Sequence, residues 1–173
     1  MPDSLTREST TTSVVLLATT PACRLFCADG TLLDRISDQL AVLPVRDVQV
    51  VTPGGGLGAD LRGVAKIARA ATGAVAVLPA DLVAHTEALA LLLEHPSRDT
   101  GALVSHDAAA APMRPPVRIE GGKIVAAGSS FHLVPEANAT FRGVLQAGRP
   151  TWPRWPTSPR SWPSWPTRAS SAP

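Results

Sequence analysis

Residues 73–83, which read GAVAVLPADLV, decide the predicted fold. The apolar run at residues 74–78 predicts a short buried strand, and Asp81 follows where this strand ends. Ligands of open α/β sheets bind beyond the carboxyl ends of the strands, so Asp81 is a candidate ligand for a metal ion or part of a phosphate site. The alternative interpretation is that Asp81 caps a helix beginning near Val83, with its carboxylate accepting backbone N–H groups.

On both sides of this strand, other apolar segments alternate with helical patterns. Further strands are predicted at residues 14–18, 47–52, 101–105 and 141–146, and helices at residues 31–43, 59–71 and 83–94. Thr31 and Asp34 fit a capping box at the start of the first helix. In the second helix, Leu61, Val64 and Ala68 share one apolar stripe and are expected to be buried.

Gly121 and Gly122 separate two more strand patterns, at residues 117–120 and 123–126, which predicts a β-hairpin with a two-residue turn. Strands that alternate with helices, followed by a late hairpin, predict an α/β fold. We expect a three-layer, Rossmann-like arrangement with a mostly parallel sheet, and the hairpin outside the set of parallel strands.

The chain of 173 residues is long enough for one domain, and 45% of its residues are hydrophobic. Residues 1–12 predict a disordered lead, residues 13–149 the domain itself, and residues 150–173 a disordered tail rich in Pro and Trp. All four tryptophans lie in this tail, and each precedes a proline, which prevents helix formation. Trp-Pro codons read in a neighbouring frame encode Leu-Ala. The tail is therefore interpreted either as a Pro-rich recognition segment or as out-of-frame sequence that leaves the domain incomplete.

Charge and cysteine content exclude several classes of function. Residues 1–149 carry 13 Lys and Arg against 14 Asp and Glu, so the net charge of +2 comes from the tail. A nearly neutral domain lacks the clustered cations that bind nucleic-acid phosphates, and no apolar run approaches the roughly 20 residues of a membrane helix. Cys23 and Cys27 are too few for a structural zinc site and are expected to be reduced thiols. Together with the lack of a signal-peptide core, this predicts a cytoplasmic protein.

Five segments, in order, resemble the nucleotidyltransferase-like domains of GT-A type, which include nucleotide-diphospho-sugar transferases and molybdenum-cofactor guanylyltransferases. Residues 14–24 (VVLLATTPACR) stand where that family has its nucleotide loop, and residues 30–43 (GTLLDRISDQLAVL) where it has the following helix. Residues 47–52 (DVQVVT), 78–82 (LPADL) and 141–144 (FRGV) are similar to later segments of the family. The resemblance therefore covers most of the predicted domain.

This resemblance implies a Mg²⁺-dependent transfer of a nucleotidyl group from a nucleoside triphosphate to a phosphorylated small molecule. It also implies that Asp81 holds Mg²⁺ beside the nucleotide phosphates and that Ala18, Thr19 and Arg24 bind the nucleotide. No catalytic residue is assigned. Similar domains precede CDP-alcohol phosphotransferase modules in some bacterial proteins, which suggests a link to phospholipid synthesis.

The loop at residues 19–22 (TTPA) departs from the family because it holds no glycine. Glycine lets backbone N–H groups approach phosphate closely, and Pro21 has no N–H, so triphosphate binding and catalysis are expected to be weak or lost. The first alternative is a non-catalytic binding or scaffold module of a larger phospholipid-synthesis protein. The second is a dinucleotide-binding domain, because the segment from Gly54 to Ala59 (GGGLGA) fits Gly-x-Gly-x-x-Gly/Ala and Asp81 follows 25 residues after Gly56.

Overall fold

The computed structural model describes residues 12–94, 100–106, 114–129 and 132–148. Most of the predicted lead and the whole of the predicted tail lie outside these residues, and Thr12 belongs to the first strand. Within the described part of the chain, seven strands form one mixed sheet in the order β4-β1-β5-β9-β7-β8, with β6 paired to β9. No described helix is long and apolar enough to cross a membrane.

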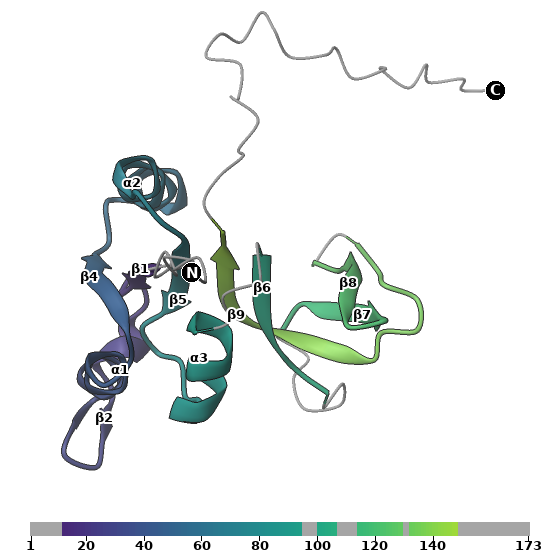
Figure 1. Cartoon of the computed structure of the whole chain (residues 1–173), viewed down its shortest axis with the longest axis horizontal. Helices are drawn as coiled ribbons and strands as arrows, with labels where there is room; N and C mark the ends of the chain where they lie inside the picture. Colours follow the sequence, from purple (N-terminus) through teal and green to yellow (C-terminus); the bar gives the residue numbers. More distant parts are fainter. Residues whose placement is uncertain (1–11, 95–99, 107–113, 130–131, 149–173) are drawn as a thin grey trace, which may run out of the picture.

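The parallel part of the sheet consists of β4 (Val45–Val51), β1 (Thr12–Leu17) and β5 (Val75–Pro79). β1 lies in the middle, and its Leu16 is paired with Val50 on one side and Leu78 on the other. The helices that connect these strands are α1 (Leu32–Ala41) and α2 (Leu57–Ala70), and α3 (Thr86–Leu93) follows β5. The α/β fold class and the parallel arrangement of these strands are therefore confirmed (Figure 1).

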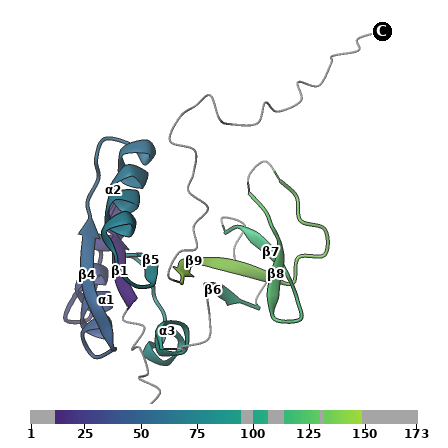
Figure 2. The ribbon, with the colours of Figure 1, turned by 45° about the horizontal axis from the view of Figure 1, so that its top comes forward.

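The remaining strands run antiparallel to their neighbours. β9 (Ala139–Ala147) pairs with β5 on one side and with β6 (Thr100–Ser105) on the other. The first residues of β9 pair with β7 (Pro116–Glu120). β7 forms a hairpin with β8 (Lys123–Ala127), and this hairpin lies far from α1 and α2 (Figure 2). Gly121 and Gly122 have φ angles of 54° and 74°, which suit glycine in a two-residue turn. The predicted hairpin is confirmed.

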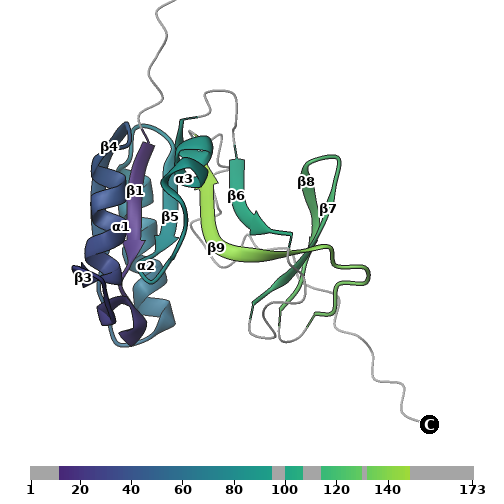
Figure 3. The same cartoon turned by 90° about the horizontal axis from the view of Figure 1, so that it is seen from below.

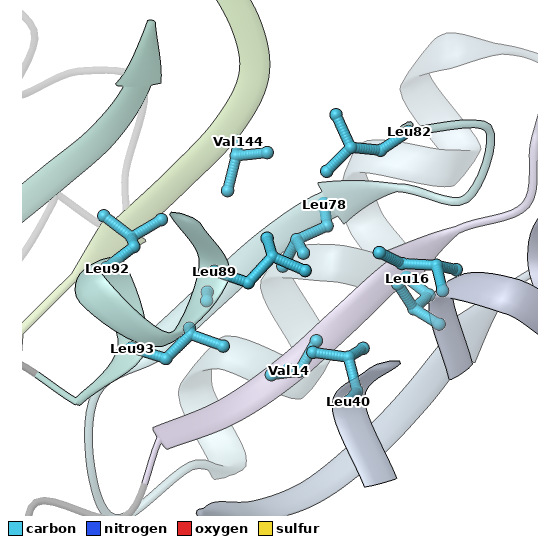
Figure 4. Packing of buried hydrophobic residues seen from close by; sticks show 11 residues of the cluster. Val14, Leu16, Leu40, Leu78, Leu82, Leu89, Leu92, Leu93 and Val144 are labelled. Atoms are coloured by element: carbon cyan, nitrogen blue, oxygen red, sulfur yellow. The ribbon is translucent and has the colours of Figure 1, made fainter. Parts of the chain in front are cut away.

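Helices cover both faces of the parallel strands, which gives three layers. α1 and α2 lie on opposite sides of β1 (Figure 3). On the α1 face, Val14 and Leu16 of β1 and Leu78 of β5 pack against Ile36 and Leu40 of α1 in a fully buried cluster. Three leucines of α3 and Val144 of β9 complete this cluster (Figure 4). Apolar surface removed from water stabilises a fold by about 25 cal/mol per Å², so this cluster stabilises the packing of α1 and α3 on the sheet.

The start of α1 is set by the predicted capping box. The Thr31 hydroxyl accepts a hydrogen bond from the Asp34 backbone N–H at 3.1 Å, and the Asp34 carboxylate accepts one from the Thr31 backbone N–H at 2.9 Å. The Thr31 hydroxyl also donates to the Asp34 carboxylate at 2.7 Å. The hydrogen bonds that this carboxylate accepts, first from the Thr31 backbone and then from its side chain, lower the pKa of Asp34. The prediction for this helix terminus is confirmed.

The apolar stripe predicted to be buried on α2 is not buried. No residue of α2 is buried, and Leu61 is 57% exposed. α2 approaches the sheet through Gly63, where an added Cβ would lie 3.5 Å from Val51 of β4, and Leu61, about 200° around the helix, points away from this contact. Val64 and Ala68 are half-buried, so periodicity identified the apolar side of the helix but not how far its residues are buried.

Candidate functional site

The carboxyl ends of the three parallel strands meet at one edge of the sheet. The backbone N–H of Ala18, after β1, donates to Val51 O of β4 at 2.9 Å, and the N–H of Ala80, after β5, donates to Leu17 O at 3.0 Å. Ala18 and Ala80 are buried and form a small cluster with Cys23. The loop after β1 is thereby fixed beside the turn after β5, where Asp81 lies.

Asp81 is held at this edge by a hydrogen bond from a side chain of the loop after β1. The Thr20 hydroxyl donates to Asp81 Oδ2 at 3.2 Å, which joins two loops 61 positions apart in the chain. The alternative interpretation of Asp81 as a helix cap is wrong, because α3 begins only at Thr86 and has His85 as its N-cap. The chain turns between Asp81 and α3, with the Leu82 N–H donating to Pro79 O at 3.2 Å.

The loop after β1 is a short 3₁₀ helix, η1 (Pro21–Arg24), rather than an open phosphate loop. Pro21 occupies its first turn and has no N–H, and the Cys23 N–H and Sγ–H are both directed at Thr20 O, at 3.4 and 2.9 Å. Cys23 and Cys27 are free cysteines. The compact turn leaves few backbone donors for an anion, which agrees physically with the absence of glycine from this loop.

Of the residues implied by the family resemblance, Ala18 packs in one cluster with Ala80, the residue before Asp81, and Thr19 precedes Thr20 in the loop after β1. Ala18 is buried and Thr19 is half-buried, whereas Arg24 is exposed at the end of η1. Thr20 makes the direct contact to Asp81, although the sequence analysis did not select it. Its only signal was its place in the TTPA segment.

A cleft of about 410 Å³ opens on the other side of Asp81. Two cations line it, Arg114 before β7 and Arg142 in β9, and the sequence analysis missed both. Its remaining wall residues are Pro79, Leu82, Val83, Pro115, Phe141 and Gly143. With two guanidinium groups and one carboxylate among its lining residues, the cleft is suited to an anionic ligand that also binds a cation.

A bulge in β9 shapes this cleft. Between its pairings with β6, β9 takes four positions from Phe141 to Leu145 while β6 takes only two. Gly143, in the bulge, has a φ of 81°, and an added Cβ there would lie 3.0 Å from Pro79 Cγ. Glycine is therefore required for β9 to pass close to the end of β5. Bulges re-aim neighbouring side chains, and this one places Arg142 in the lining of the cleft.

The donor set around Asp81 is compatible with Mg²⁺. Among the residues that the structure describes, no group of three His, Cys, Asp or Glu could by itself hold a metal ion. Mg²⁺ is commonly bound through one or two carboxylates together with substrate phosphates and water. Asp81 supplies one carboxylate at the strand ends, and the Thr20 hydroxyl adds a polar group beside it.

The glycine-rich loop before α2 is closed by its own helix. The Gly54 N–H donates to Asp60 Oδ1 at 2.7 Å, and Gly55 and Gly56 have φ angles of 92° and 137°. The Gly54 N–H is thus bonded to Asp60, whereas a dinucleotide motif needs its loop N–H groups free for pyrophosphate. This contact argues against the dinucleotide-binding alternative.

Comparison with known proteins rests on structure alone. No family model matches the chain, and no curated protein sequence matches it. The inositol-1-phosphate CTP transferase from T. maritima superimposes with a TM-score of 0.59 and 14% identity, over 80% of this chain and 71% of the other. A structure of 4-diphosphocytidyl-2C-methyl-D-erythritol synthase gives a TM-score of 0.50 and 20% identity, over 78% and 74% of the two chains.

The chain has the nucleotidyltransferase-like fold. The fold expected from the family resemblance is therefore confirmed. In this nucleotidyltransferase-like fold, Asp81 lies at the strand ends, with the loop after β1 on one side and the cleft on the other.

Proposed function

We propose that this domain binds a nucleoside triphosphate with Mg²⁺ at the loop after β1 and a phosphorylated small molecule in the cleft beside it. The observation that carries the proposal is the position of Asp81, which receives the Thr20 hydroxyl at 3.2 Å and also lines the cleft of Arg114 and Arg142. One carboxylate thus borders two places suited to phosphate groups. The nucleotidyltransferase-like fold supports this interpretation.

On the nucleotide side, Ala18 and Thr19 hold the strand end in place while the exposed Arg24 offers a cation for phosphate. Asp81 is the residue that would hold Mg²⁺, and the ion would neutralise phosphate charge as it accumulates during transfer. The Thr20 hydroxyl orients the Asp81 carboxylate toward this side. The loop itself contributes little, because Pro21 has no N–H and Cys23 is bound to Thr20.

On the acceptor side, Arg142 and Arg114 would bind the phosphate of the small molecule by charge-assisted hydrogen bonds. In the proposed transfer, an oxygen of this phosphate forms a bond to the α-phosphorus of the nucleotide. The bond from the α-phosphorus to the oxygen bridging it to the β-phosphate breaks, and pyrophosphate leaves with that electron pair. Positioning and charge stabilisation by these side chains are the protein's contribution.

We further propose that turnover is slow, since the loop after β1 lacks the glycines that would bring backbone donors to the triphosphate. A cytoplasmic role in phospholipid synthesis is part of the same proposal. Its support is the two free cysteines and the phosphorylated polyol in the name of the inositol-1-phosphate CTP transferase.

Titration calorimetry with the four nucleoside triphosphates tests this function. Binding of at least one triphosphate is expected with Mg²⁺, and it should disappear when the metal is chelated. The Asp81→Ala variant should lose binding while its far-ultraviolet circular dichroism stays unchanged, because Asp81 lies outside every helix and strand. Tight binding that survives Asp81→Ala would exclude Asp81 from the site.

A non-catalytic binding module is the second candidate, favoured by the closed 3₁₀ turn at residues 21–24. In that case no triphosphate binds with or without Mg²⁺, while inorganic phosphate or a sugar phosphate still binds in the cleft of Arg114 and Arg142. Rapid turnover by this chain alone would instead show that the loop is competent.

A further inference from the structure

The cleft beside Asp81 combines a few charges with apolar walls. Three of its nine lining residues are charged, namely Asp81, Arg114 and Arg142. The other six are Pro79, Leu82, Val83, Pro115, Phe141 and Gly143. None of these six described residues has a side chain that donates or accepts hydrogen bonds. The side chains of the cleft therefore offer charge and apolar surface, but no hydroxyl or amide group.

The backbone of the cleft wall adds little that could bind a ligand hydroxyl. Pro79 and Pro115 have no N–H. Their carbonyl oxygens already accept hydrogen bonds, Pro79 O from the Leu82 N–H at 3.2 Å and Pro115 O from the Phe141 N–H at 3.0 Å. Four of the six uncharged lining residues are thus bonded to one another. A hydroxyl group placed against them would lose hydrogen bonds to water and find few new partners, which costs free energy.

Part of the apolar lining is open to solvent. Val83 lines the cleft and is 64% exposed, and Pro79 and Phe141 are half-buried. Leu82, in contrast, is buried in the hydrophobic core, which holds this wall in place. An apolar group of a ligand that lies against Val83 and Phe141 would remove this surface from water and stabilise the complex.

The two arginines of the cleft are available to an anion. In the part of the chain that the structure describes, neither guanidinium group of Arg114 and Arg142 forms a hydrogen bond or an ion pair. Arg118 of β7, by comparison, forms ion pairs with Glu120 and Glu136. Guanidinium groups bind phosphate through paired N–H donors, so the cleft retains the capacity to bind a phosphate group.

We propose that the cleft selects a phosphate ester whose alcohol part is an apolar ring or branched chain, in preference to the phosphate of a polyol. Arg114 and Arg142 bind the phosphate, and the alcohol part lies against Val83 and Phe141. This inference rests on the proposed function, because it narrows the phosphorylated small molecule assigned there to the cleft. The volume of about 410 Å³ lies within the range of small-molecule sites, roughly 300–1,000 Å³.

Two phosphate esters with the same carbon ring test this preference. Cyclohexyl phosphate and inositol 1-phosphate both carry a phosphate group on a six-membered carbon ring, and only the second has hydroxyl groups on the other five carbons. In calorimetric titrations of the full-length chain, cyclohexyl phosphate should bind at least about fivefold more tightly, because its ring covers apolar surface without leaving hydroxyl groups unpaired. Inorganic phosphate, which has no ring, should also bind more weakly than cyclohexyl phosphate.

A variant of the apolar wall tests where the ring lies. Val83→Ser should reduce the preference to less than about twofold, because it removes apolar surface and adds a hydroxyl group. Val83 lies outside every helix and strand, so the variant should fold. The matched control is Val42→Ser, since Val42 is also outside the helices and strands, is 75% exposed and does not line the cleft. This control should keep the preference of the wild type.

The location of the phosphate is tested separately by Arg142→Ala, which should weaken both esters by the same factor. Equal affinities for the two esters, or tighter binding of inositol 1-phosphate, would overturn the inference and leave the phosphate site of the proposed function intact. A preference that persists in Val83→Ser would also overturn it. If neither the esters nor inorganic phosphate bind, the acceptor site of the proposed function is wrong, and the inference is wrong with it.

Discussion

Asp47 and Asp81 are carboxylates near opposite ends of the parallel strands, and they differ in how their oxygens are used. Asp47 of β4 accepts hydrogen bonds from Ser13 Oγ at 2.6 Å and from Gln49 Nε2 at 2.8 Å. These bonds, from Gln49 first and then from Ser13, lower the pKa of Asp47. Asp81 receives a longer hydrogen bond, from the Thr20 hydroxyl at 3.2 Å.

Both carboxylates line a cavity, so a cavity alone does not identify a site. The cavity at Asp47 measures about 260 Å³, and there the side chain joins β4 to β1 through Ser13. The cleft at Asp81 measures about 410 Å³ and adds two arginines to the carboxylate. A carboxylate saturated by its own protein is structural, whereas one with spare oxygen capacity beside cations is available to a ligand.

The largest effect is expected from removing each charge in turn. Asp81→Asn should weaken binding of the Mg²⁺–nucleoside triphosphate complex at least about tenfold, or ~1.4 kcal/mol, because the amide cannot replace the carboxylate as a Mg²⁺ ligand. Asp47→Asn should leave that affinity unchanged. Calorimetric titration of both variants measures the difference, and equal losses would abolish the distinction between the two carboxylates.

A smaller effect is expected from the neighbouring arginines. Arg142→Ala should weaken binding of a sugar phosphate several-fold, about 1 kcal/mol, since a charge-assisted hydrogen bond in the cleft is lost. The control is Arg46→Ala near Asp47. Arg46 donates to Thr72 Oγ1 and does not line the cleft of Asp81. Affinities from competition with a labelled phosphate ester check this. A larger effect of Arg46→Ala would place the phosphate site beside Asp47 and not in the cleft of Asp81.

For the free energy of unfolding, the larger effect is expected at Asp47 and the smaller one at Asp81. Asp47→Ala is expected to lower the free energy of unfolding by about 1 kcal/mol, since it leaves Ser13, a buried residue, without its hydrogen-bond acceptor. Asp81→Ala should change the free energy of unfolding by less than about 0.5 kcal/mol. Urea denaturation measures both. A larger loss for Asp81→Ala would mean that Asp81 serves the fold rather than a ligand.

The smallest expected effect is on the pH dependence of stability. Because the pKa of Asp47 is lowered in the folded state, its stabilisation is present above the unfolded value and disappears as the pH falls through the folded value. The difference in unfolding free energy between the wild type and Asp47→Asn should therefore be constant near neutral pH and shrink below about pH 4. A difference that grows in acid would contradict the assigned direction.

Much of the fold followed from the sequence because local patterns determine it. The β-branched runs of β1 and β4, the two glycines of the hairpin and the Thr31–Asp34 capping box are each encoded within a few residues. The stripe of α2 containing Leu61 was wrongly expected to be buried, since periodicity identifies an apolar side but not how far its residues are buried.

The candidate site followed from the sequence only in part. Asp81 was selected because it follows a recognisable strand. Arg114 and Arg142 belong to segments that become neighbours only when β9 crosses from β7 to β5, and no local pattern encodes that crossing. Thr20 was missed for the same reason, because its partner lies 61 positions away.

Paramagnetic broadening of amide NMR signals by Mn²⁺, added with a nucleoside triphosphate, tests the central claim most directly. Mn²⁺ accepts the same oxygen ligands as Mg²⁺ and broadens signals of nearby residues. The account predicts strong broadening of Thr20 and Asp81 and their neighbours, with Asp47 unaffected. Broadening centred on Asp47, or none at Asp81, would contradict the assignment of a metal–nucleotide site to the carboxyl end of the sheet.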